Sequence, residues 1–168
     1  NHDATFTPGI STKRGVSLGA EFRYLEPHYN GVLNLDAFPN DRLTGRARYA
    51  LSLNHEAALI SNATFSARVL RVSDNDYWKD FPRNLDTLTP RLLLSDLQAS
   101  KPIGEWTTYS RVMRWQVVQN ADAFIKEAPY ERLPQIGART TQKWGNGLVV
   151  AFEGEFNRFT NPVGTLAE

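Results

Sequence analysis

Three aspartates in a short polar run are the residues whose spacing first suggests chemistry. Asp74, Asp76 and Asp80 bring carboxylates close together along the chain, as in loops that bind a hard cation. An EF-hand loop requires Gly at its sixth position, and Lys79 stands there instead. We therefore interpret the run as a polar loop rather than as a metal site.

The residues that could perform catalysis are scattered along the chain. His2, His28 and His55 lie near expected strand ends, without the neighbours of a Ser-His-acid triad, and the chain has no cysteine. The formal net charge of +1 creates no field that would attract a polyanion. The sequence predicts that the protein is not an enzyme, binds no metal or cofactor, and has no nucleic-acid partner.

The elements that position these residues are strands, as residues 16–24 illustrate. Alternate positions there are apolar: Val16, Leu18, Ala20, Phe22 and Tyr24. The positions between them are small or charged: Ser17, Gly19, Glu21 and Arg23. A period of two places the two sets on opposite faces of a β-strand. Residues 44–55 and 147–159 have the same pattern, whereas Asp96 and Arg111 interrupt it in two other segments.

The whole chain, residues 1–168, is expected to form one all-β region without a long helix. About nine strand-like segments are separated by polar or turn-forming residues: 2–10, 15–26, 30–37, 44–55, 61–73, 89–99, 105–118, 131–144 and 147–159. Their order predicts an antiparallel up-and-down meander. Several exceed ten residues, whereas the usual globular strand has about 5–6 and a membrane strand about 9–11.

The expected connections alternate between short and long. Short ones fall at 27–30, 56–60, 101–104 and 145–146, and longer ones at 38–43, 74–88 and 119–130, the last with room for a turn of helix. Asn30-Gly31 and Asn146-Gly147 are dipeptides that tight hairpins favour. Because alternate connections of a meander emerge at the same end, one end should carry turns and the other loops. Outer-membrane barrels have this asymmetry.

The two strand faces suggest two architectures. In a membrane barrel the apolar face would contact lipid, through candidates such as Leu18, Phe22, Tyr49, Leu51, Phe152 and Phe156. The charged face would then line a watered lumen, through Glu21, Arg23, Arg46, Arg48, Glu153 and Glu155. The alternative is a self-contained, soluble lipocalin-like barrel that binds an apolar ligand. Its closed interior would have to bury these charges or its exterior expose the apolar face, so we favour the membrane barrel.

Aromatic residues near the expected strand ends support the same choice. Membrane barrels place girdles of aromatic side chains at both interfaces. The candidates are Tyr24, Tyr29, Phe38, Trp78, Trp106, Trp144 and Phe159.

Several stretches, taken in order, resemble one family. They are residues 3–8, 14–15, 21–25, 33–36, 71–81 and 130–135, of which 71–81 (RVSDNDYWKDF) is the most specific. The family is LptD (Imp/OstA), the lipopolysaccharide-assembly proteins of Gram-negative outer membranes. The resemblance extends over nearly the whole chain. It implies that the chain is the N-terminal part of a much larger β-barrel, without the jelly-roll domain and the remaining strands.

The resemblance also implies a function and partners. The complete protein would insert lipopolysaccharide into the outer leaflet, with an LptE-type plug lipoprotein in its lumen and an LptA-type bridge in the periplasm. Lipid would leave through a seam beside the first strand. Pro8 lies in that strand and cannot donate a backbone hydrogen bond, which makes it our lateral-gate candidate.

Overall fold

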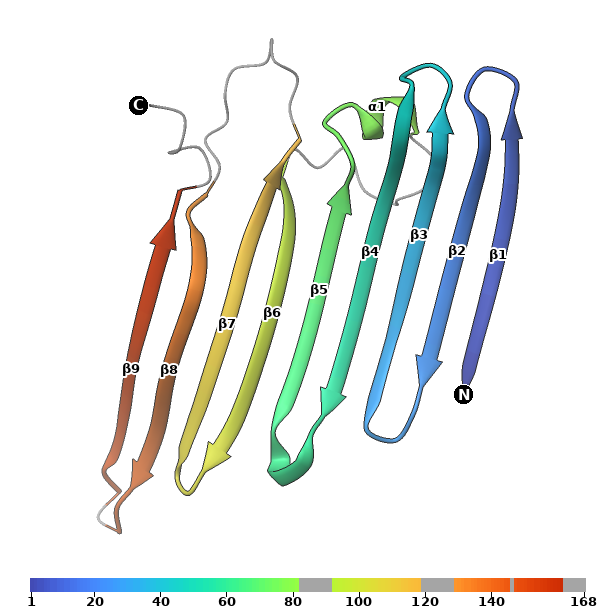
Figure 1. Cartoon of the computed structure of the whole chain (residues 1–168). Helices are drawn as coiled ribbons and strands as arrows, with labels where there is room; N and C mark the ends of the chain where they lie inside the picture. Colours follow the sequence, from blue (N-terminus) through green and yellow to red (C-terminus); the bar gives the residue numbers. More distant parts are fainter. Residues whose placement is uncertain (82–91, 119–128, 146, 162–168) are drawn as a thin grey trace.

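The computed structural model contains one nine-stranded antiparallel sheet in which consecutive strands are neighbours (Figure 1). It describes residues 1–81, 92–118, 129–145 and 147–161. The strands are β1 (His2–Ser11), β2 (Gly15–Leu25), β3 (Tyr29–Asp41), β4 (Arg46–Ala58), β5 (Thr64–Val72), β6 (Leu92–Ile103), β7 (Trp106–Val117), β8 (Glu131–Lys143) and β9 (Val149–Thr160). The predicted all-β up-and-down meander is confirmed.

The sheet is open, because β1 and β9 are its edges and do not pair with each other. A self-contained closed barrel of the lipocalin kind, the alternative architecture, is therefore not what this chain forms. Strands of nine to 13 residues lie side by side, and β1 and β9 pair only with β2 and β8.

The two ends of the sheet differ, as predicted. At one end, called here the turn end, the connections β2–β3, β4–β5, β6–β7 and β8–β9 are all short (Figure 1). A 3₁₀ turn, η1 (Ile60–Asn62), fills the second of them. The opposite end, the loop end, carries two short turns and the two long connections, one of which contains the short helix α1 (Tyr77–Asp80).

The structure corrects two predicted connections. Asn30 and Gly31 belong to β3, and the turn lies one step earlier, where the Glu26 backbone N–H donates to the Tyr29 carbonyl at 2.8 Å. Gly31 is needed for a different reason, since the Tyr24 ring on the neighbouring strand occupies the space that a Cβ would take. Residues 38–43 are not a long connection, because β3 continues to Asp41.

Other boundaries differ by a few residues. The expected connection 101–104 is mostly strand, since β6 and β7 pair as far as Ile103 and Trp106, leaving only Gly104 and Glu105 in the turn. Gly104 adopts a φ of 58°, which explains the choice of glycine. Strand β5 begins at Thr64, later than expected. Most of the 119–130 connection, including its expected helical turn, lies outside the described residues.

Outside three bulges, register assigns the paired strand residues to one of two faces. One row across β2 to β5 is Phe22, Leu33, Leu53 and Val69. The neighbouring row on the other side is Arg23, Val32, Asn54 and Arg68, and it continues to Asp96 in β6. We call the side that carries Phe22 the apolar face and the side that carries Arg23 the polar face.

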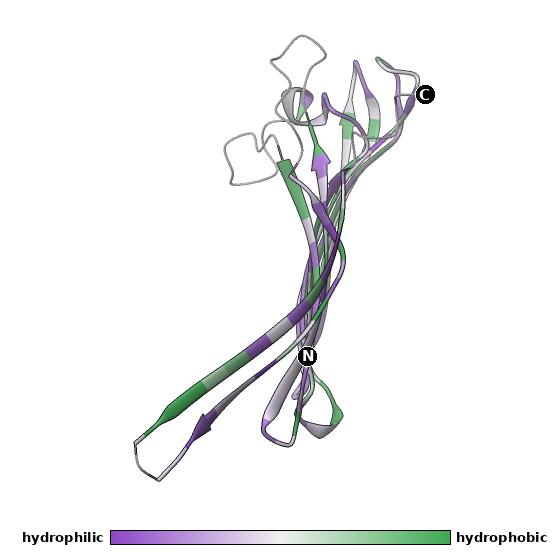
Figure 2. Ribbon diagram, turned by 90° about the vertical axis from the view of Figure 1, so that its left-hand side faces the viewer, coloured by the Kyte–Doolittle hydropathy of each residue, from purple (hydrophilic) through white to green (hydrophobic). Residues whose placement is uncertain are grey.

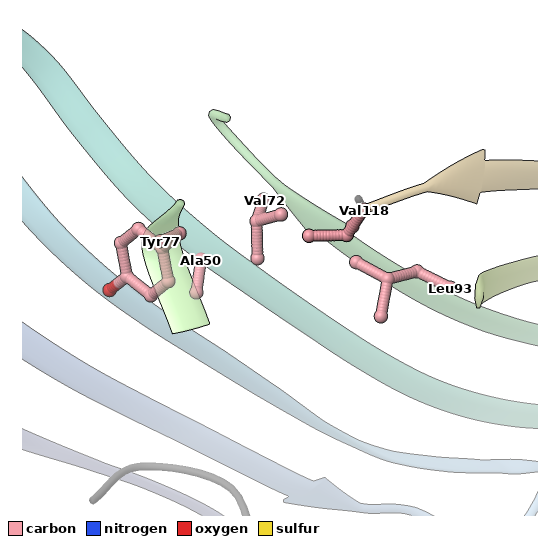
Figure 3. Close-up of a cluster of buried hydrophobic side chains, with 5 residues drawn as sticks. All are labelled: Ala50, Val72, Tyr77, Leu93 and Val118. Carbon is pink, nitrogen blue, oxygen red and sulfur yellow. The ribbon is translucent and has the colours of Figure 1, made fainter. Parts of the chain in front are cut away.

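A small buried cluster lies at the loop end. Figure 3 shows its five members, Ala50, Val72, Tyr77, Leu93 and Val118. Tyr77 comes from α1, which stands out on one side of the strongly twisted sheet (Figure 2). Leu70 and Phe81 pack against the cluster. Packing in the described part of the chain is therefore concentrated where the segment after β5 returns to the sheet.

Candidate membrane-facing and lumen-facing surfaces

The apolar face exposes large hydrophobic side chains along almost its whole width. Leu18, Phe22 and Tyr49 are 40%, 38% and 45% exposed, and Phe152 and Phe156 are 55% and 63% exposed. Leu51, the sixth lipid-facing candidate, is half-buried on the same face. Phe6, Ile10, Leu97, Trp106 and Ile136 are also exposed there by register. Exposed apolar surface of this extent is typical of a face that contacts lipid or protein.

An aromatic band crosses this face at the turn end. Tyr24 contacts the rings of Phe22, Tyr29 and His55 at centroid distances of 5.6, 5.9 and 5.7 Å. Its hydroxyl and His55 Nδ1 are hydrogen-bonded at 2.6 Å. His55 also packs on Phe65, so the band extends to β5. Rings with an apolar body and a polar tip suit a membrane–water boundary.

Four of the other five girdle candidates do not belong to this band. Phe38 pairs with Arg48 and therefore lies on the polar face, where its ring stacks on Phe81 at 4.4 Å. It is not part of an aromatic band on the apolar face, because the 38–41 stretch continues the strand rather than entering a loop. Trp106 and Trp144 lie at the turn end and are 44% and 58% exposed. Phe159 lies at the loop end of β9 beside Tyr130, and the Trp78 side chain is outside the described part of the structure.

The polar face carries charges in paired arrangements. Arg23 Nε donates to Asp3 at 2.9 Å and lies 3.4 Å from Glu21, and both Arg23 and Glu21 side chains are well exposed. Asp96 and Arg111, which interrupt the sequence pattern, form a bidentate pair with both bonds at 2.7 Å. The guanidinium and the carboxylate thus satisfy each other on one face, which the sequence alone did not indicate.

Glu153 and Glu155 belong to a second polar network on β7 to β9. The Tyr109 hydroxyl lies 3.1 Å from Glu153 and 3.0 Å from Glu155. Gln135, which is buried, donates its amide to Glu155 at 2.7 Å. The two carboxylates are exposed on the polar face, and a tyrosine and a glutamine fix their orientation.

Arg46 and Arg48 have different environments although they are two residues apart. Arg46 is 60% exposed, and its guanidinium is 4.0 Å from Asp74. The Arg48 side chain is only 1% exposed, so the expectation that it faces solvent is wrong. Its Nε and Nη2 donate to the two oxygens of Asp74 at 2.8 and 2.7 Å, and Nη1 reaches Asp80. The segment after β5 covers this arginine, which strand periodicity cannot reveal.

Two of the three aspartates in residues 74–80 therefore bind the guanidinium group of Arg48. Asp74 and Asp80 both form ion pairs with Arg48, and no group of three or more potential metal ligands occurs in the part of the chain that the structure describes. Burial alone would raise the pKa of Asp74, but hydrogen bonds from Arg48 and Ser73 hold that pKa below its ordinary value. Asp74 is thus a carboxylate over the whole neutral range.

The free edge of β1 lacks one backbone N–H donor, at Pro8. Asn1 and Leu25 exchange both backbone hydrogen bonds, so the odd residues of β1 bond to β2 and the even residues point their backbone groups away from it. Pro8 pairs with Leu18 and is an even residue. Its nitrogen therefore faces the open edge, where an N–H would otherwise be offered to the next strand.

The sequence also matches a protein-family model. The model for LptD, LPS transport system D, matches residues 46–167. The chain belongs to the LptD family. LPS-assembly proteins LptD of Polaromonas sp. and Acidovorax sp. are 40% and 42% identical to it over 95% of its length, and that of Ralstonia nicotianae is 33% identical over 96%. The chain spans only about a fifth of the length of these relatives.

The LptD resemblance was strongest in residues 71–81, and the structure gives that stretch a physical meaning. Its two outer aspartates bind Arg48, its tyrosine is fully buried, and its phenylalanine packs on Phe38 and beside two arginines. None of the helices in the described ranges has the length and apolar character needed to cross a membrane.

Proposed function

We propose that this chain supplies the first strands of an outer-membrane β-barrel that inserts lipopolysaccharide into the outer leaflet of a Gram-negative bacterium. Membership of the LptD family supports a role in lipopolysaccharide assembly. The observation that carries the finer proposal is the division of one open sheet into an exposed apolar face and a face of paired charges. Such a sheet requires further strands to close and lipid to cover its apolar side.

In this role each face has a separate task. Leu18, Phe22, Tyr49, Leu51, Phe152 and Phe156 contact acyl chains, and the Tyr24–His55 band marks one membrane boundary. Glu21, Arg23, Arg46, Glu153 and Glu155 line a watered lumen in which hydroxyl groups and phosphates of the saccharide can exchange hydrogen bonds. Arg48 belongs to the same wall but is covered.

The exit is a seam at the edge of β1. Because Pro8 offers no N–H to the strand that closes the full-length barrel, the ladder there lacks one hydrogen bond. An LptE-type lipoprotein in the lumen and an LptA-type bridge on the periplasmic side are the proposed partners, with outer-membrane lipid around the barrel. The role involves movement of a lipid and no covalent step.

Photocrosslinking in the full-length protein tests this proposal. A photoreactive amino acid replaces Arg46 on the polar face or Tyr49 on the apolar face of the same strand. We expect lipopolysaccharide adducts at position 46 in growing cells, lost when lipopolysaccharide synthesis is inhibited, and phospholipid adducts at position 49 under both conditions. Absence of lipopolysaccharide adducts at position 46, or the same adducts at both positions, would refute the assignment of the faces.

A further inference from the structure

The segment comprising residues 73–81 folds back over the polar face instead of extending into solvent. Tyr77 is completely buried and joins Ala50 and Val72 in the cluster of Figure 3. Phe81 stacks on Phe38 of β3. Phe38 and Ala50 are both on the polar face by register, because Phe38 pairs with Arg48 and Ala50 follows two residues later. The 73–81 segment therefore occupies space on the lumen side of the wall.

Arg48 is the centre of the contacts that hold this segment. It binds Asp74 at the start of the segment and Asp80 near its end, so one guanidinium group attaches both ends of the segment to β4. A planar, permanently charged fork suits this bidentate role. The guanidinium carbon also lies 5.6 Å from the ring centre of Tyr77 and 5.1 Å from that of Phe81.

A second arginine reinforces the attachment from the β1–β2 turn. Arg14 donates to Asp41 at 2.6 Å and lies 3.1 Å from Asp80. Its guanidinium carbon is 4.8 Å from the ring centre of Phe81. Asp41, which is fully buried, also lies 3.4 Å from Arg48. Three carboxylates and two guanidinium groups from four parts of the chain are thus joined at the loop end.

We infer that Arg48 is a positioning residue that keeps the 73–81 segment folded against the inner wall, and that the fixed segment narrows the loop end of the lumen. This rests on the proposed function, since it takes the polar face as the lumen wall. Without Arg48, Asp74 and Asp80 lose their buried partner and are better solvated away from the sheet. The apolar contacts of Tyr77 and Phe81, together with the ion pair between Arg14 and Asp80, then have to hold the segment.

The attachment of the 73–81 segment is tested first by measuring the mobility of a spin label on that segment. A nitroxide label is placed at exposed Asn75 in the full-length protein in lipid nanodiscs. In Arg48→Gln we expect a mobile spectral component to appear and the ratio of attached to detached segment to fall by about 100-fold or more, as for a broken buried ion pair. Arg48→Lys keeps the charge without the fork and should give an intermediate spectrum. Lys13→Gln, at an exposed site in the β1–β2 turn, is the charge-matched control and should leave the spectrum unchanged.

The narrowing is tested by the entry of a hydrophilic dye too large for general porins into cells that carry each variant. We expect entry to increase several-fold with Arg48→Gln and to stay at the wild-type level with Lys13→Gln. Heat-dependent mobility in gels verifies that each barrel has formed. Where Arg48→Gln does not form a barrel, the double variant Asp74→Asn, Asp80→Asn removes both charges that pair with Arg48, and with them the charge that Arg14 pairs with at Asp80. It should give the same two results.

Each outcome is decisive. An immobile label in a folded barrel without Arg48, or without both loop aspartates, would show that this arginine does not position the segment. A mobile label without increased dye entry would show that the segment does not narrow the lumen. Failure of the proposed function appears elsewhere, as missing lipopolysaccharide adducts at position 46 while the label still responds to Arg48→Gln.

Discussion

Gly137 offers the most direct test of how the sheet is held together. It pairs with Tyr109 across β7 and β8, and the tyrosine ring lies over it to reach Glu153 and Glu155 on β9. The three atoms nearest to a Cβ at position 137 would all belong to Tyr109: its Cζ, its hydroxyl oxygen at 2.5 Å and its Cε1 at 2.9 Å. Glycine is therefore required here by one neighbouring side chain.

We expect Gly137→Ala to displace the Tyr109 ring and separate its hydroxyl from the two carboxylates. Forcing an extra methyl group into a packed position costs about 1–3 kcal/mol. With Tyr109→Ala already present, the methyl group has free space, and Ala instead stabilises the strand by about 0.5–1 kcal/mol relative to Gly. The two substitutions should therefore be coupled by about 1.5–4 kcal/mol.

The assay is a double-mutant cycle of unfolding free energies, measured by urea titration of the full-length protein in lipid vesicles with tryptophan fluorescence as the signal. Gly154→Ala is the matched control, because no atom lies within 4 Å of a Cβ built at that position on the neighbouring strand. It should be neutral or slightly stabilising in both backgrounds. An equal cost of Gly137→Ala with and without the Tyr109 ring would refute the reasoning.

Two further predictions concern the edge and the loop. Pro8→Ala restores an N–H at the open edge of β1 and should stabilise the pairing of β1 with the closing strand of the full-length barrel by about 0.5–1.5 kcal/mol. Crosslinking between these two strands should increase, and lipopolysaccharide delivery should become slower. Unchanged crosslinking and transport would contradict the proposal that lipid leaves through a seam at β1. The pKa of Asp74 is lower in the folded protein than the ordinary Asp value of about 3.9. The Asp74 carboxylate therefore stabilises the attached 73–81 segment fully above about pH 3.9, and this stabilisation is lost as the pH falls through the lower folded pKa. The label at Asn75 should keep its spectrum from pH 7 to 5 and become mobile only below about pH 4, and mobility that already rises near neutral pH would argue against this carboxylate.

Much of the fold could be predicted because strand periodicity is a local property. The alternation in residues 16–24 already assigned Phe22 and Arg23 to opposite faces, and the structure has them there. Turn positions were less accurate because a dipeptide with hairpin chemistry can serve another need. Gly31 looked like a turn residue, yet it lies within β3 to accommodate the ring of Tyr24.

The candidate site residues were also predicted only in part from the sequence. Arg46 and Arg48 have the same side-chain type and the same parity, so sequence reasoning treated them alike. Only the return of α1 over β4 separates them, leaving one exposed and one buried. The spacing of Asp74 and Asp80 predicted only a polar loop, and it did not reveal that both carboxylates bind a guanidinium group of the same chain.

The sequence by itself determined the strands, their two faces and the family, since these depend on residue type and spacing along one chain. The tertiary structure decided which charges are covered, which aromatic residues share a band, and which backbone groups of β1 face the free edge. These depend on contacts between residues distant in sequence, such as Arg48 with Asp74 and Asp80, and on the pairing phase of neighbouring strands. Neither is encoded in a local period of two.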